Sequence, residues 1–181
     1  MRDAARAEME RRAAEFRATV SARRAEMQDE IQAKRDELKV RLRSIRDERK
    51  KQVVERVDEA LRALNERVTN HLLAVLERIE KALSGIAERS DRAEGRGLDA
   101  AGVRSALAAA QGAIASARAA VQAQASHLYA VSISTEERLR ADVGNTRQAL
   151  HADLKAVRET VRAAHDAARK AAVALAQIEK G

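Results

Sequence analysis

The sequence contains no proline, no cysteine and no tryptophan, and it has one phenylalanine and one tyrosine. Without cysteine, the chain can form neither a disulfide nor a thiolate metal site. A compact catalytic core usually draws on aromatic and turn residues, which are scarce in this chain. Alanine, arginine, glutamate and leucine dominate instead, and all four are strong helix formers. The composition therefore predicts an all-α protein whose long helices pack on one another.

The positive charge of the chain is concentrated near its beginning. The 35 Lys and Arg residues exceed the 28 Asp and Glu residues, which gives a net charge of +7. Residues 1–51 hold 16 of the basic residues and 11 of the acidic ones, so most of the excess lies in the first quarter. We expect no transmembrane segment, because no stretch approaches the roughly 18 uncharged apolar residues that one needs. The charged first residues also indicate no signal peptide in this chain.

An eleven-residue (hendecad) repeat runs from Met9 to about Arg96. One column of the repeat is apolar throughout: Met9, Val20, Ile31, Leu42, Val53, Leu64, Val75 and Ile86. The column three residues later is basic at every position but one: Arg12, Arg23, Lys34, Ile45, Arg56, Arg67, Arg78 and Arg89. Eleven residues make three helical turns of roughly 3.67 residues, so each column follows a nearly straight line along a helix. The repeat predicts one long helix.

The apolar stripe of this helix changes in width near Val53. Before Val53 it is a narrow seam, formed by Met9, Phe16, Val20, Met27, Ile31, Leu38 and Leu42. After Val53 it also includes the columns of Val57, Val68, Ile79 and of Leu61, Leu72, Leu83. A narrow stripe suits one partner helix or none, whereas a wide one suits two neighbours. We therefore predict a basic helical stalk over residues 1–52 and a bundle over residues 53–181.

The bundle is predicted to contain three antiparallel helices, at about 53–92, 98–131 and 135–179. Gly95 and Gly97 can supply the positive φ that a helix end needs, and Asp99 is a candidate N-cap for the second helix. Ser134 followed by Glu137 fits a capping box before the third helix. Short connections between helices of comparable length favour this up-down-up arrangement.

Motifs for chemistry are absent from the sequence. None of His71, His127, His151 and His165 follows a glutamate at the three-residue spacing of a bundle di-iron site. The stretch 95–100 matches a loose dinucleotide fingerprint, but a predicted helix precedes it where that fingerprint requires a strand. The carboxylates alternate with arginines at helical spacing, which is typical of solvated ion pairs. We expect no enzyme, no cofactor, no metal site and no small-molecule substrate.

The first functional hypothesis is structural: an elongated helical scaffold or spacer that self-associates through the stalk. The seam would pair with a second copy of the chain, giving a homo-oligomer, and the interleaved charges would set the register. Because the repeat is a hendecad, such pairing would be nearly straight or slightly right-handed. Leu42→Asp would then separate the paired stalks without melting the bundle.

Two other hypotheses involve the basic residues. One side of the predicted stalk could bind a polyanion such as a nucleic acid through Arg17, Arg24, Arg35, Lys39, Arg46 and Lys50. A column of glutamates on the same helix and the lack of aromatic residues for base stacking argue against this. The third hypothesis is association of the amphipathic helix with an anionic membrane surface. It ranks lower, because the wide apolar face after Val53 already has protein partners in the bundle.

The stretches 45–51, 57–67, 139–143 and 150–158 carry a resemblance to a known group of proteins. Together they resemble uncharacterised exported long-helix (coiled-coil) proteins of candidate phyla radiation bacteria, over about residues 26–178. Such relatives generally carry a secretion signal, so the resemblance implies an exported or cell-envelope location. It implies no activity, cofactor or site residue.

Overall fold

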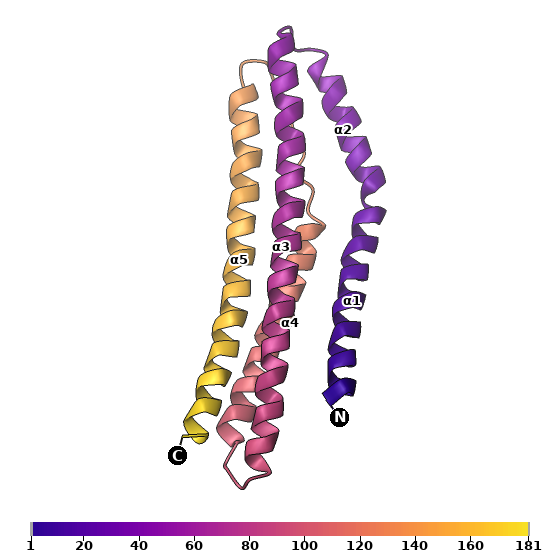
Figure 1. Ribbon diagram of the computed structural model, residues 1–181. Coiled ribbons are helices and arrows are strands. Elements are labelled where there is room, and N and C mark those ends of the chain that lie inside the picture. Colours follow the sequence, from indigo (N-terminus) through magenta and orange to yellow (C-terminus); the bar gives the residue numbers. More distant parts are fainter. Residues whose placement is uncertain (1, 181) are drawn as a thin grey trace. The chain divides into compact units, whose positions relative to one another are not determined.

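A computed structural model of the chain describes the backbone of residues 2–180, with the side chains of residue 7 and of residues 10–180. The helices are α1 Arg2–Glu26, α2 Gln28–Leu42, α3 Glu48–Glu94, α4 Ala101–Ala125 and α5 Leu139–Ile178 (Figure 1). No strand occurs within the described range, so the predicted all-α class is confirmed. The side chain of the predicted seam residue Met9 lies outside the described residues.

The chain divides into two compact units, each built from segments that lie far apart in the sequence. Unit 1 comprises Met1–Arg17, His71–Val121 and Val157–Gly181, and unit 2 comprises Ala18–Asn70 and Gln122–Ala156. Helices α1, α3, α4 and α5 each contribute residues to both units. Residues 18–42, which the sequence predicted to be part of a stalk, belong to unit 2.

The predicted first helix is interrupted twice, at Met27 between α1 and α2 and again at residues 43–47. Helix α2 ends at Leu42 and α3 begins at Glu48. The carboxylate of Asp47 accepts hydrogen bonds from the backbone N–H groups of Arg49 (2.9 Å) and Lys50 (3.2 Å), so Asp47 caps α3. Ile45, the one apolar residue in the basic column, is only 2% exposed. Burial of Ile45, Leu38 and Leu42 in unit 2 favours the turn over a continuous helix.

Unit 1 packs α3, α4 and α5 together, as the three-helix prediction requires. The ion pairs between Glu94 and Arg104 and between Glu80 and Arg118 join α3 and α4 at successive levels, so these helices are antiparallel. Alanines with no exposed surface lie on α4 and α5, and small residues let helix axes approach closely. They are Ala110, Ala117, Ala164 and Ala171.

The turn between α3 and α4 follows the prediction from its glycines. Gly97 has φ = 86°, in the region that favours glycine. The N–H of Leu98 donates to the carbonyl of Ala93 (3.1 Å) and the N–H of Gly97 to that of Glu94 (2.8 Å), which is a Schellman motif. The carboxylate of Asp99 accepts the N–H of Ala101 at 2.9 Å, which confirms the predicted N-cap.

Unit 2 contains an extended segment where the sequence predicted helix as far as residue 131. Helix α4 ends at Ala125, and residues 127–135 adopt no regular structure. Tyr129, Val131 and Ile133 are buried while Ser132 and Ser134 are exposed, the alternation of an extended chain. Their core neighbours include residues of α2, α3 and α5: Leu38, Leu42, Val54, Leu61, Leu139, Leu150 and Leu154. Extending the chain therefore places three large side chains in the core of unit 2.

Candidate functional site

The predicted seam is covered by the chain itself. Val20, Leu38 and Leu42 are buried, and Phe16, Met27 and Ile31 are half-buried. Leu38 and Leu42 belong to the core of unit 2, where they share a cluster with Val54 and Leu61 of α3. Residues that were expected to meet a second copy are therefore packed within one chain. Self-association through this region stays a prediction.

Most of the residues predicted to bind a polyanion have partners within the chain. Arg17 forms an ion pair with Glu77 in unit 1. In unit 2, Lys39 lies 3.8 Å from Asp36 and Lys50 lies 2.9 Å from Glu136. Arg35 is half-buried, and the backbone N–H of Arg46 donates to Glu136 at 3.0 Å. The remaining residue, Arg24, leads to the most extensive polar cluster of unit 2.

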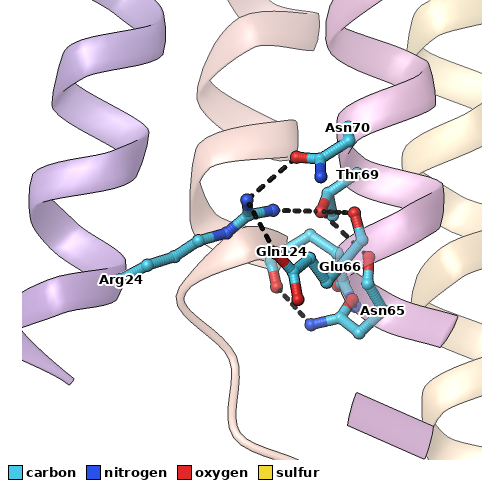
Figure 2. A network of polar contacts seen from close by, with 6 residues as sticks. All are labelled: Arg24, Asn65, Glu66, Thr69, Asn70 and Gln124. Atoms are coloured by element: carbon cyan, nitrogen blue, oxygen red, sulfur yellow. Dashed lines mark hydrogen bonds and ion pairs between the residues drawn. The ribbon is translucent and has the colours of Figure 1, made fainter. Parts of the chain in front are cut away.

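Arg24 extends from α1 toward α3, where its guanidinium group contacts three polar side chains (Figure 2). Its Nη2 donates to Thr69 Oγ1 at 2.7 Å and its Nη1 to Asn70 Oδ1 at 2.9 Å. The carboxylate of Glu66 lies 3.7 Å from Nη1. Thr69 is fully buried, and its hydroxyl donates in turn to the carbonyl of Asn65 at 2.9 Å. The cluster joins α1 to α3 through a charged group that stays partly exposed.

A buried chain of hydrogen bonds continues from Asn65 across unit 2. Asn65 Nδ2 donates to the carbonyl of Gln124 (3.0 Å), and Gln124 Nε2 donates back to Asn65 Oδ1 (2.9 Å). Gln124 Nε2 also donates to the Tyr129 hydroxyl (2.9 Å), which donates to Asp153 Oδ2 (2.6 Å). These bonds connect α3, the end of α4, the extended segment and α5.

The electrostatics of this network favour a structural role over proton transfer. Burial, followed by the hydrogen bond to Asp153, raises the pKa of the Tyr129 hydroxyl well above its usual value. The hydroxyl therefore stays protonated at neutral pH, whereas a general acid or base works best with a pKa near the operating pH. The His127 ring stacks on that of Tyr129 with centroids 4.4 Å apart. The network holds four segments in register.

A second buried polar group secures the extended segment to α3. Asp58 is 4% exposed, and its Oδ1 accepts the backbone N–H of Val131 at 3.2 Å. Its Oδ2 accepts a hydrogen bond from Arg62 Nη2 at 2.9 Å. Arg62 Nε is the one buried side-chain nitrogen or oxygen without a hydrogen-bond partner in the described part of the chain. Asp58 thus satisfies a backbone group that helix α4 would have satisfied had it continued.

Unit 1 contains a groove of about 610 Å³. Its floor includes the buried side chains of Leu83, Leu107 and Ile114. At its rim Arg118 Nε donates to Glu80 Oε1 at 2.7 Å, while the Phe16 ring centroid lies 4.5 Å from the Arg118 guanidinium carbon. The arginine thus contacts both α1 and α3, and its contact with Phe16 is a cation–π interaction. This arrangement fastens α1 to unit 1.

Comparisons of the chain with protein-family models, curated proteins and solved structures find no match. Of the helices in the described residues, none combines the length and the apolar character that crossing a membrane requires. Over the same residues, no three His, Asp or Glu side chains are grouped so that they could hold a metal ion.

Acid should weaken one contact that stabilises the α2–α3 turn. The N–H of Arg46 and then the ammonium of Lys50 lower the pKa of Glu136. A depressed pKa means that the Glu136 contribution is complete above the ordinary value of 4.5 and is lost as the pH falls through the lower, folded-state value. We expect Glu136→Gln to be less stable than the parent at pH 7 and to lose less stability between pH 5 and pH 3. Urea unfolding between pH 3 and pH 7 measures the stability of the parent and of Glu136→Gln. If the stability of both proteins fell equally between pH 5 and pH 3, the prediction would be wrong.

Proposed function

We propose that the protein is structural: a helical scaffold or spacer that self-associates through its N-terminal helices and has no catalytic role. The observation that carries the proposal is that the buried polar side chains of unit 2 form hydrogen bonds with one another. These bonds connect α3, the end of α4, the extended segment and α5 through Asn65, Gln124, Tyr129 and Asp153. Long helices support the spacer role: α3 is 47 residues long, which corresponds to about 70 Å.

The half-buried seam residues support self-association. Phe16, Met27 and Ile31 keep part of their surface exposed after α1 and α2 have packed on the chain. Val40 and Val53, on α2 and α3, are 59% and 49% exposed. Apolar side chains that remain accessible on neighbouring helices can contribute to an interface between copies.

Light scattering across a range of concentrations tests the proposal. The parent chain should exceed the 19.8 kDa mass of the monomer. Replacing Met27 and Ile31 together by glutamate should return it to a monomer, because two charges would then lie on the seam. Val173→Glu is the matched control: Val173 is 50% exposed on α5, so its replacement should leave the mass unchanged. A parent chain that is monomeric at every concentration would contradict self-association.

A second candidate function, polyanion binding, is favoured by the α2–α3 turn. Arg43, Arg46 and Arg49 are all exposed at or next to this turn. Phosphate groups bound there would release counterions, so affinity would fall steeply with salt. Changing the three arginines to glutamate should abolish retention of DNA or RNA. The control changes Arg140, Arg147 and Arg158, exposed on α5, and makes the same change in net charge. Equal loss in both variants would indicate a nonspecific charge effect.

A further inference from the structure

The eleven-residue spacing continues through the α2–α3 turn although the helix does not. Leu42 precedes the turn and Val53 follows it at the spacing of the apolar column. The turn residues, 43–47, include neither proline nor glycine. No residue in the turn therefore prevents a continuous helix, and straightening would align the two parts of the stripe.

Several contacts stabilise the turn in its bent form. Ile45 is buried in the core of unit 2, Asp47 caps α3, and the N–H of Arg46 donates to Glu136. A straight helix would lose these contacts, whereas the N–H groups of residues 43–45, which already donate to backbone carbonyls in the turn, would only change acceptor. A single chain therefore favours the bent form, and straightening requires contacts with a second copy that replace those it loses.

We refer to residues 2–42, which precede the turn, as the arm. In unit 1 the arm contacts the rest of the chain through Arg17 with Glu77 and through Phe16 with Arg118. In unit 2 its contacts include Arg24 with Thr69 and the burial of Leu38 and Leu42. The contacts of Arg17, Phe16 and Arg24 are with helices that follow the turn in sequence, and the cluster that buries Leu38 and Leu42 also includes the extended segment. The same contacts can form with the arm of another chain.

We infer that the arm exchanges between two copies of this chain, so that each arm occupies the surface of its partner that it covers in a single chain. The partner is a second copy because a second copy carries the same side chains that the arm contacts within one chain. The inference rests on the proposed self-association and specifies how it occurs. It also accounts for the apolar column of the repeat, which keeps its spacing from Leu42 to Val53 across residues that a single chain uses for a turn.

Cysteine pairs test the exchange directly, since the chain has no native cysteine. One preparation carries Arg17→Cys and another carries Glu77→Cys, so no chain can link these positions within itself. The two are mixed, unfolded, refolded at high concentration and treated with a short bis-maleimide. We expect a covalent dimer whose linked peptides contain residues 17 and 77. Each variant treated alone controls for random collision. Absence of a 17–77 link between chains would overturn the exchange.

Variants of the turn shift the same equilibrium in opposite directions. Ile45→Arg with Asp47→Ala restores the basic column and removes the cap, and it should raise the yield of the 17–77 link about tenfold. Arg43→Gly with Arg46→Gly disfavours a straight helix and should lower the yield. If the Ile45→Arg, Asp47→Ala variant fails to fold, the cysteine pair in the parent chain still tests whether the arm exchanges.

The exchange and the proposed function can fail separately. An oligomeric parent without a 17–77 link between chains would overturn the exchange and would leave self-association in place. A 17–77 link that forms on refolding of the cysteine pair at high concentration, together with a parent chain that is monomeric without refolding, would support the exchange and contradict self-association of the natural chain. Light scattering and peptide mapping of the same preparations separate these outcomes.

Discussion

Leu42→Asp is expected to unfold unit 2. Leu42 is 3% exposed and belongs to the cluster that contains Leu38, Ile45 and Val54. A carboxylate at this position has no cationic partner in the cluster, so its desolvation should cost more than about 4 kcal/mol. That is a large share of the roughly 5–15 kcal/mol that stabilises a typical domain. Thermal and urea unfolding monitored by circular dichroism should show an early loss of helix.

Val40→Asp provides the matched control for this prediction. Val40 lies on the same helix but is 59% exposed, so a carboxylate there should change stability by less than about 0.5 kcal/mol. The two interpretations of residues 1–52 give opposite results for Leu42→Asp. A free stalk would lose its partner without losing stability, whereas the packing of α2 in unit 2 requires a loss of stability. An unchanged melting temperature would therefore contradict this packing.

The sequence predicted some of the elements that depend on local pattern. The predicted capping box at Ser134 was wrong, because the N–H and hydroxyl of Ser134 donate to Asp142 and α5 begins only at Leu139. The Gly97 helix end and the Asp99 cap were correct, because positive φ and side-chain capping are set by residues next to the helix end. The widening of the stripe also indicated that α3 would be buried by more than one neighbour. In the structure Leu61, Leu72 and Leu83 are buried, while Val53 at the edge of the stripe is half-exposed.

The turn at residues 43–47 was missed although two residues signalled it. Ile45 interrupts the basic column, and Asp47 is a residue type that favours the N-cap. Both signals are weak compared with the hendecad repeat, which continues before and after the turn. What decides between a turn and a straight helix is the burial of Ile45 in a cluster with residues distant in the sequence, including Tyr129 and Leu154. A pattern read along one helix does not contain that information.

The polar network was missed for a related reason. The apolar residues of α3 are interspersed at helical spacing with Asp58, Asn65 and Thr69. Polar residues in such positions are usually exposed to solvent at the edge of the apolar stripe. All three are buried here, because Val131, Gln124 and Arg24 supply their partners. Two of these partners lie at or after the end of α4, where the sequence predicted a continuing helix. The network could be predicted only from the knowledge that residues 127–135 are extended.

Asp58→Ala should produce the largest effect among the polar residues. It removes the acceptor for the N–H of Val131 and the carboxylate that pairs with Arg62. Leaving a buried donor and a partly buried guanidinium without an acceptor should cost roughly 2–4 kcal/mol. Urea unfolding measures the loss, and the fluorescence of Tyr129, the single tyrosine of the chain, reports on unit 2. Faster hydrogen exchange at the Val131 amide would locate the effect.

Two further variants separate the contributions of Asp58. Asp58→Asn keeps an oxygen that can accept the Val131 N–H but loses the charge, so it should cost roughly 1–2 kcal/mol. Arg62→Met removes the guanidinium whose Nε has no partner, so the double variant Asp58→Ala, Arg62→Met should recover part of the stability lost by Asp58→Ala alone. Strict additivity in this cycle would show that Asp58 and Arg62 are not coupled, and the loss would then belong to the bond with Val131. Coupling of the expected sign would instead assign part of it to the buried charge pair.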